Sequence, residues 1–162
     1  MERIKKTLKI QIEKLEKELR VDIPKELEKA ASLGDLSENA EYQYLKERQF
    51  YLSARIAQLK QRLSDISLIN IDDIPRDKVG YGSKVYLIEL DTNKEVVYKL
   101  VFPEESDVGK GLISTASPVG RALMGKEMGE EVVVTVPNGK RSFLIKRIQT
   151  IHDLLEEERE EV

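Results

Sequence analysis

Two narrow stripes of apolar residues, separated by a short polar segment, constrain the fold of this chain more than any other feature. In the first, apolar side chains recur every three or four residues from about residue 4 to residue 31, the period of one helix face. The second follows a heptad-like spacing over residues 45–66. The stripes consist of Leu8, Ile12, Leu15, Leu19, Ile23 and Leu27, and of Leu45, Leu52, Ile56, Leu59, Leu63 and Ile66. They predict two helices that face each other.

The connection between these helices is short. Only residues 33–37 separate the two patterns, and so short a connection makes neighbouring helices antiparallel. We therefore predict a helical hairpin whose tip is the sequence LGDLSENAEYQY, residues 33–44. Each arm of about 30 residues would be about 45 Å long, which is more reach than a compact core needs. Pro24 should bend the first arm or begin a new helical segment, because proline lacks an amide donor.

The pattern changes to a β-rich one after residue 74. Two pairs of alternating runs flank the turns DTNK and PNGK and predict two β-hairpins: residues 83–90 with 95–102, and residues 131–136 with 140–148. Between them, Ser117, Pro118 and Gly125 suit the cap, the first position and the end of a short helix. We expect a sheet of four or five strands with one short helix.

These patterns predict an α+β fold class, in which an N-terminal antiparallel α-helical coiled-coil hairpin precedes a small β-rich domain. The expected divisions are the hairpin at 1–74, a linker at 75–82, the β-rich domain at 83–150 and an acidic tail at 151–162. We expect the tail to be solvated or frayed, as acidic runs commonly are. The single histidine, His152, lies near this tail, so we expect it to be solvated and without an acid–base role.

Composition excludes several classes of protein. The 162 residues are 35% charged and 40% hydrophobic with a net charge of −3, which is typical of a globular protein. Such a balance argues against holding nucleic acid by bulk charge, so any contact with RNA or DNA would be local. Without cysteine there is no disulfide or thiolate site, which fits the cytoplasm. We expect neither a signal peptide nor a membrane span, because no long apolar run is present.

Three acids cluster at the predicted tip. Asp35, Glu38 and Glu41 fall within seven positions, and the nearest basic residues are Lys29 and Lys46. One interpretation is a helix start, at which Asp35 or Ser37 caps the second helix and Glu38 and Glu41 lie in its first turns. The helix dipole stabilises carboxylates at such positions. Against this, a cap needs only one side chain, and clustered acids repel one another.

The other interpretation is half of a metal site. Asp35 and Glu38 are three residues apart, and Ser37 and Asn39 add neutral oxygens. Oxygen ligands select hard cations such as Mg²⁺, and two carboxylates alone bind that ion weakly. The site would therefore be completed by a partner.

Two stretches of the sequence resemble a known protein family. The stretches GDLSENAEYQYLKERQ and LISTASPVGRALMGKEMGEEVVVTVPNG together resemble the bacterial Gre transcript-cleavage factors, nearer to GreA than to GreB, and the resemblance spans nearly the whole chain. It implies a hairpin inserted through the secondary channel of RNA polymerase and an FKBP-like C-terminal domain docked on the channel rim. The partners implied are bacterial RNA polymerase and the backtracked RNA 3′ end, with no membrane and a monomer when free.

The resemblance also implies roles for individual residues. The protein would not be an enzyme, but would activate the polymerase's own Mg-dependent cleavage of backtracked RNA. Asp35 and Glu38 match the family's catalytic, metal-associated acids, which help to hold Mg²⁺ shared with polymerase. The matching tip-support residues are Ser37, Asn39, Glu41, Tyr42 and Lys46, and the matching polymerase-binding residues are Ser117, Pro118 and Arg121. Tyr42 could either staple the helix or contact an extruded base.

Departures from the family pattern limit what it implies. Residues 30–33 lack the basic residue that many relatives place before the tip, and lysine at position 46 loses the bidentate fork of arginine. We therefore expect a weak grip on long extruded RNA. Two alternatives stay open: an active prolyl isomerase, which the scarcity of aromatic residues disfavours, and a coiled-coil adaptor or channel plug that supports no cleavage.

Overall fold

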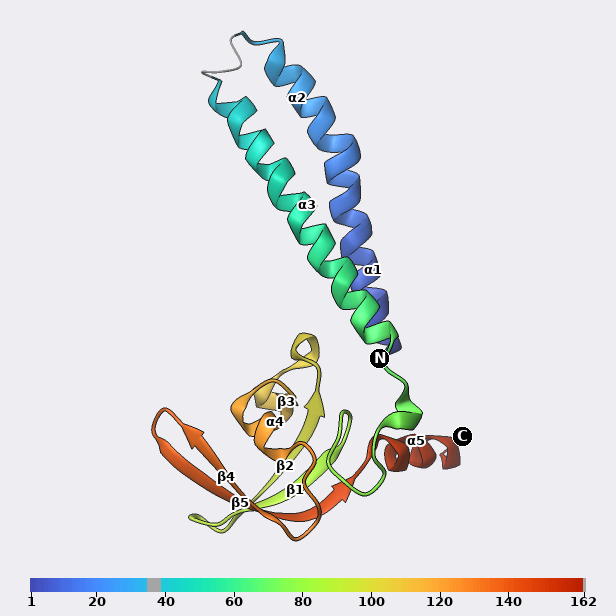
Figure 1. Cartoon of the computed structure of the whole chain (residues 1–162), viewed down its shortest axis with the longest axis vertical. Helices are drawn as coiled ribbons and strands as arrows, with labels where there is room; N and C mark the ends of the chain where they lie inside the picture. The colour runs from blue at the N-terminus through green and yellow to red at the C-terminus, as the bar shows by residue number, and fades with distance from the viewer. Residues whose placement is uncertain (35–38, 162) are drawn as a thin grey trace. The chain divides into compact units, whose positions relative to one another are not determined.

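The computed structural model of the chain describes residues 1–34 and 39–161. The chain divides into two compact units, Met1–Ile69 and Asn70–Val162. The first is a helical hairpin and the second contains a mixed five-stranded sheet, so the predicted α+β class is confirmed (Figure 1). Within the described ranges, no helix combines the length and apolar character that a membrane span requires.

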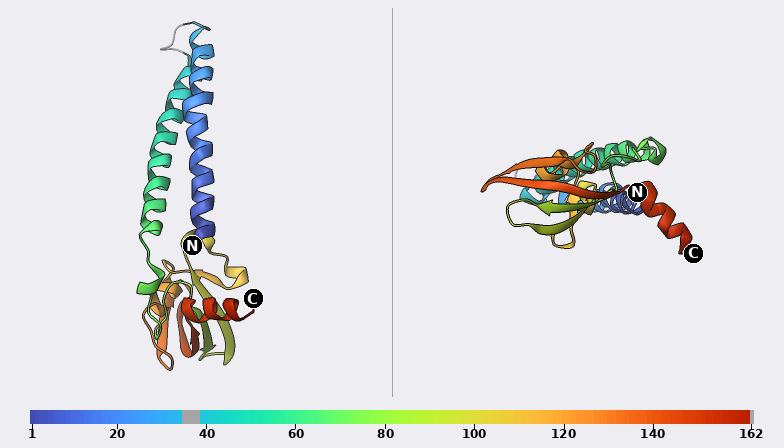
Figure 2. Two further views of the ribbon diagram at one scale, coloured as in Figure 1. Left: turned by 90° about the vertical axis from the view of Figure 1, so that its right-hand side faces the viewer. Right: turned by 90° about the horizontal axis from the view of Figure 1, so that it is seen from below.

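The first arm of the hairpin consists of three consecutive helical segments. These are α1 (Glu2–Lys17), a π-helical turn (Glu18–Asp22) and α2 (Ile23–Ala31). The return arm is the single helix α3 (Ala40–Ser67), and it runs beside α1 and α2 in both views (Figures 1 and 2). Pro24 lies in the first turn of α2, directly after the π-helical turn. A new segment therefore begins there, as the sequence predicts.

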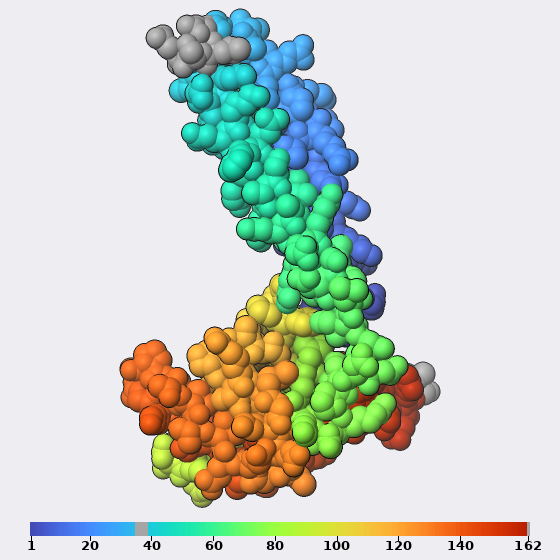
Figure 3. Space-filling model, in the orientation of Figure 1, coloured from blue at the N-terminus to red at the C-terminus, as the bar shows by residue number. Residues whose placement is uncertain are grey.

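The predicted apolar stripes hold the arms together. Leu52 and Ile66 on α3 are fully buried, and Ile23 on α2 is only 2% exposed. Other stripe residues, among them Leu15 and Leu63, are half-buried, as expected where only two helices meet. Each fully buried aliphatic side chain contributes about 1.5–3 kcal/mol. Side chains of the two arms fill the space between the ribbons (Figure 3).

The second unit is built on one mixed sheet with the strand order β3-β2-β1-β5-β4. Its strands are β1 (Lys84–Glu89), β2 (Lys94–Val101), β3 (Leu112–Ser114), β4 (Glu131–Val136) and β5 (Gly139–Gln149). The pairs β1–β2 and β4–β5 are antiparallel, which confirms both predicted hairpins. The short β3 pairs in parallel with β2. Three 3₁₀ turns complete the connections at Ile71–Asp73, Pro103–Glu105 and Val108–Lys110.

The helix α4 (Pro118–Leu123) contributes to the core on one face of the sheet. Its Leu123 is fully buried, as are Phe143 and Ile145 of β5. Val79 also belongs to this core, and its N–H donates to the carbonyl of Lys126 at 2.9 Å. The chain is therefore already packed against the sheet before β1 begins.

The acidic tail is a helix, α5 (Ile151–Glu160). Its end is therefore not frayed, but its acids are exposed, as the expectation of a solvated tail predicts. Thr150 and Asp153 form a capping box: the Thr150 hydroxyl accepts from the Asp153 N–H at 3.3 Å, and Asp153 Oδ2 accepts from the Thr150 N–H at 2.9 Å. Such reciprocal bonds satisfy two amides at the helix start. The acids of α5 are thus ordered by its N-terminal cap.

The expectation that His152 is solvated is also wrong. Its side chain is 7% exposed, and Nε2 lies 2.7 Å from the carbonyl oxygen of Ile74. The reason is its place in the first turn of α5, where the preceding Ile151 packs closely on Gly82. His152 therefore ties α5 to the chain segment before the sheet, a structural role.

Candidate functional site

The tip of the hairpin is held together by Asn39. Its Oδ1 accepts from the N–H of Tyr42 at 3.1 Å, which makes it the N-cap of α3. Its Nδ2 donates to the carbonyl of Ala30 at 2.9 Å, near the end of α2. One side chain therefore both begins the second arm and bonds it to the first.

Three of the predicted tip residues, Asp35, Ser37 and Glu38, lie outside the described residues. They belong to the stretch of sequence between Gly34 and Asn39. The interpretation that Asp35 or Ser37 caps the second helix is wrong, because α3 begins at Ala40 and Asn39 is its cap. The metal half-site remains a prediction.

The other tip residues lie in the first two turns of α3. Glu41 is exposed in the first turn, where the helix dipole stabilises a carboxylate. Tyr42 is half-buried, and the Lys46 ammonium lies 5.7 Å from the centroid of its ring. A cation–π contact of this kind directs the exposed lysine back toward the tip.

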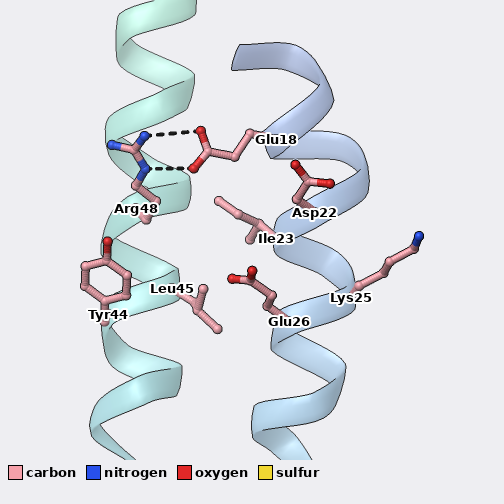
Figure 4. Close-up of a pocket in the computed structure, with 8 residues that line it drawn as sticks. All are labelled: Glu18, Asp22, Ile23, Lys25, Glu26, Tyr44, Leu45 and Arg48. Atoms are coloured by element: carbon pink, nitrogen blue, oxygen red, sulfur yellow. Dashed lines mark hydrogen bonds and ion pairs between the residues drawn. The ribbon is translucent and has the colours of Figure 1, made fainter. Parts of the chain in front are cut away.

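Two ion pairs brace the arms further along the hairpin, and Figure 4 shows the one between Glu18 and Arg48. Arg48 of α3 donates from Nε and one terminal nitrogen to the two carboxylate oxygens of Glu18, at 3.0 and 3.1 Å. Lys60 reaches Glu16 at 2.8 Å. The hydrogen bond from Lys60 lowers the pKa of Glu16, and that to Glu18 raises the pKa of Arg48.

The π-helical turn adjoins a cleft between the arms. The cleft has a volume of about 380 Å³ and is lined by Glu18, Asp22, Ile23, Lys25, Glu26, Tyr44, Leu45 and Arg48 (Figure 4). Its acids do not make a metal centre: across residues 1–34 and 39–161 no group of three or more acidic, histidine or cysteine side chains could hold an ion.

The predicted polymerase-binding residues form a well-ordered turn in the second unit. Ser117 caps α4, since its hydroxyl accepts from the Gly120 N–H at 3.0 Å and donates to the carbonyl of Ser114 at 2.7 Å. Pro118 and Arg121 are exposed, and Arg121 Nε donates to the carbonyl of Ala116 at 2.8 Å. The structure thus places this predicted trio together on one surface turn.

Sequence reasoning missed the braces. Glu18 and Arg48 each lie three residues after a stripe leucine, Leu15 and Leu45, which is a position flanking the apolar seam. Charged residues at such positions commonly pair between helices, so this spacing was the available signal. The bond from Asn39 to Ala30 had no signal of this kind, since it depends on how the two arms meet.

Two family models match the chain. One, described as the N-terminal part of transcription elongation factors, matches residues 2–67. The other, described as the C-terminal part of the transcription elongation factors GreA/GreB, matches residues 74–150.

Individual relatives agree with this result. Transcription elongation factor GreA of Desulfotalea psychrophila is 43% identical over 145 residues, which cover 90% of each chain. GreA of Helicobacter hepaticus is 46% identical over 123 residues, 76% of each chain. A crystal structure of GreA factor homolog 1 (Gfh1) of Thermus thermophilus is 26% identical, covers 90% of this chain and 94% of that chain, and has a TM-score of 0.41.

The family models cover most of both structural units, and the sequence relatives cover most of the chain at over 40% identity. Factors of this kind act as accessories to RNA polymerase rather than as enzymes themselves. The chain belongs to the GreA/GreB transcription elongation factor family.

Proposed function

We propose that this protein enters the secondary channel of bacterial RNA polymerase and stimulates the polymerase's own cleavage of backtracked RNA, which rescues arrested complexes. The observation that carries the proposal is a braced two-helix arm whose end connection contains Asp35 and Glu38. Family membership supports RNA polymerase as the partner, and a role in transcription supports a location in the bacterial cytoplasm.

The length and bracing of the arm support this role. The 28 residues of α3 extend about 42 Å at 1.5 Å per residue. The pairs of Glu16 with Lys60 and Glu18 with Arg48 resist sliding of the arms, and the bond from Asn39 to Ala30 acts at their end. Accurate placement of a remote group can change a reaction rate by orders of magnitude. A stiff arm would deliver its tip acids in one arrangement.

The tip acids fit magnesium by their chemistry. Asp35 and Glu38 offer the hard carboxylate oxygens that Mg²⁺ prefers, and two such ligands hold it weakly. We therefore propose that these two residues hold the ion jointly with polymerase. When bound, Mg²⁺ supplies positive charge that stabilises the developing charge of phosphodiester cleavage. In this proposal Ser37, Asn39, Glu41, Tyr42 and Lys46 order the tip around these acids.

The turn at the start of α4 is the proposed docking contact with polymerase. Ser117 and Arg121 are both bonded to nearby backbone carbonyls, which reduces the entropy lost when the turn binds. Pro118 is exposed between them, and Met124 just beyond α4 is 36% exposed. The turn therefore offers an apolar patch with a fixed cation beside it.

The test uses purified bacterial polymerase stalled and backtracked on RNA labelled at its 3′ end, with Mg²⁺ present. The native protein should release short 3′ fragments, and Asp35→Ala/Glu38→Ala should bind polymerase without releasing them. The matched control is Glu13→Ala/Glu28→Ala, which removes two exposed acids from the first arm and should act as the parent.

Two results would contradict the proposal in different ways. If the native protein binds polymerase and releases no fragments, it occupies the channel without promoting cleavage. If the Asp35→Ala/Glu38→Ala variant cleaves as well as the parent, the assignment of these two acids is wrong, even though the protein stimulates cleavage.

A further inference from the structure

A group of basic side chains lies on the sheet face opposite the core of the second unit. Strand register places Lys84 opposite Lys99, and Tyr86 between Val97 and Arg147. Alternate residues of a strand share a face, and the intervening Val85 and Leu87 are in the core. We call Lys84, Tyr86, Val97, Lys99 and Arg147 the basic sheet patch.

Within residues 1–34 and 39–161, the cations of this patch have no acidic partners. Among the described residues, no ion pair involves Lys84, Lys99 or Arg147. Like charges directly opposite on neighbouring strands destabilise a sheet, and Lys84 and Lys99 are such a pair. An anionic ligand would relieve this repulsion.

Two other cations of the same sheet are paired with acids. Arg141 donates to both carboxylate oxygens of Glu89, at 3.2 and 3.3 Å, and Lys146 donates to Glu95 at 2.9 Å. Cross-strand charges are therefore matched elsewhere on the sheet. In the basic sheet patch, by contrast, two cations, Lys84 and Lys99, lie directly opposite each other.

The aromatic ring of the patch is fixed in place. The Tyr86 hydroxyl donates to Gln149 Oε1 at 2.9 Å, and Gln149 Nε2 donates to Glu157 Oε1 of α5 at 2.8 Å. The Lys84 ammonium and the Arg147 guanidinium lie 5.6 and 5.2 Å from the centroid of the ring. The nearby carboxylate of Glu157 is thus engaged by an amide.

A shallow hollow adjoins the ring. It has a volume of about 190 Å³ and is lined by Tyr86, Leu87, Glu95, Val96, Val97, Lys146 and Arg147. Val97 is 42% exposed, so an apolar surface is open to solvent beside the unpaired cations.

We propose that the basic sheet patch binds single-stranded nucleic acid. Phosphates would contact Lys84, Lys99 and Arg147, and a base would pack on the apolar surface of Tyr86 and Val97. A nucleic acid strand offers regularly spaced anions together with flat apolar bases, and aromatic residues on sheets with nearby cations recognise both. This site is local, as the net charge of −3 requires, and it is independent of the proposed tip mechanism.

The test measures fluorescence anisotropy of a fluorescein-labelled 12-nucleotide oligouridylate titrated with the full-length protein. For single strands, each phosphate contact contributes about −0.7 to the slope of log affinity against log salt, so three contacts give about −2. Raising the salt concentration from about 50 to about 200 mM should then weaken binding about 20-fold. Lys99→Gln/Arg147→Gln should leave one phosphate contact, so the same rise in salt concentration should weaken its binding only about threefold.

A matched control separates the patch from general charge. Lys110→Gln/Lys126→Gln removes two positive charges from other parts of the same unit and should keep the parent's slope. Tyr86→Phe keeps the ring and should bind as the parent, whereas Tyr86→Leu should bind more weakly.

Three results would overturn the proposal. The native protein could fail to bind the oligonucleotide at about 50 mM salt, or the control could lose as much affinity as Lys99→Gln/Arg147→Gln. Alternatively, that variant could keep its affinity for RNA and lose affinity for polymerase, which would make the patch a protein contact. The oligonucleotide titration contains no polymerase, so its failure is distinct from failure of the cleavage assay.

Discussion

Replacement of Asn39 tests whether the end of the hairpin depends on one side chain. Asn39 makes two separable bonds: Oδ1 caps α3 at the N–H of Tyr42, and Nδ2 reaches the carbonyl of Ala30 across the tip. Asn39→Ala removes both bonds. Asn39→Ser keeps an oxygen that can cap the helix but removes the bond between the arms.

The expected magnitudes follow from these contacts. Loss of a cap costs about 1 kcal/mol, and loss of a typical hydrogen bond costs about 1 kcal/mol. The Ala30 carbonyl still accepts from the N–H of Leu33 at 3.1 Å, so the second cost includes no unsatisfied acceptor. Asn39→Ala should therefore lower the local free energy of opening by about 2 kcal/mol, and Asn39→Ser by about 1 kcal/mol.

Hydrogen exchange of backbone amides measures this local free energy, because fraying ends open without global unfolding. The N–H of Gln43, which bonds to the Asn39 carbonyl at 3.0 Å, reports on the first turn of α3. Its exchange should be about 30-fold faster in Asn39→Ala and about fivefold faster in Asn39→Ser. Ser53→Ala, which removes an exposed bond within α3 far from the tip, should leave the rate unchanged.

The order of the exchange rates of the two variants tests this reasoning. If Asn39→Ser exchanges at the parental rate while Asn39→Ala is faster, the bond to Ala30 contributes nothing. If neither variant changes the exchange rate of Gln43, another group orders the tip and Asn39 does not hold the two arms together. The backtracked-complex assay should follow the same order, with Asn39→Ala weaker than Asn39→Ser, because a looser tip samples more arrangements.

Two further changes probe the second unit. Gly120→Ala would place a methyl group in overlap with the Ser114 carbonyl oxygen. We expect the free energy of unfolding to fall by about 3 kcal/mol and the melting temperature in calorimetry to fall by at least about 10 °C. Gly109→Ala, which meets only an ordinary contact, should melt as the parent. Burial, with a hydrogen bond to Glu105, raises the pKa of the Tyr81 hydroxyl well above its usual value. Unfolded tyrosine loses its proton near pH 10, so this contribution to stability is complete below about pH 10 and is lost as the pH rises further. In Tyr81→Phe the melting temperature should fall less steeply above about pH 10, and equal slopes would contradict this reasoning.

Much of this fold was predictable because its signals are local. The apolar period specifies the helical arms, and turn residues such as Asn138-Gly139 specify where β4 and β5 meet. The short β3 lacks such a signal, since its three residues pair with β2 across an intervening loop. Its place depends on contacts that a local pattern does not contain.

The misassigned helix starts have a different cause. Near the N-terminus of each of these helices, several residues are of types that form caps. The clustered acids favoured the wrong candidates. At the tip, the acids were preferred as caps over Asn39, although asparagine caps a helix as well as aspartate does. At the C-terminus the acidic run obscured the Thr150–Asp153 capping box, which is readable as threonine with an acid three residues later. His152 was misjudged for the same reason, because the helix that buries it was not expected.

The end of the hairpin is sensitive because the buried apolar side chains of α3 stop short of its N-terminus. On α3 the buried side chain nearest the N-terminus is Leu45, and the residues from Asn39 to Tyr44 are exposed or half-buried. Burial of apolar surface therefore contributes little to holding the first turn of α3. Order there has to come from polar contacts, chiefly the two bonds of Asn39. An apolar tip would be more stable, but it would be poorly suited to bring carboxylates to a cation. We therefore infer that the proposed function requires polar contacts to hold the arms together near the tip.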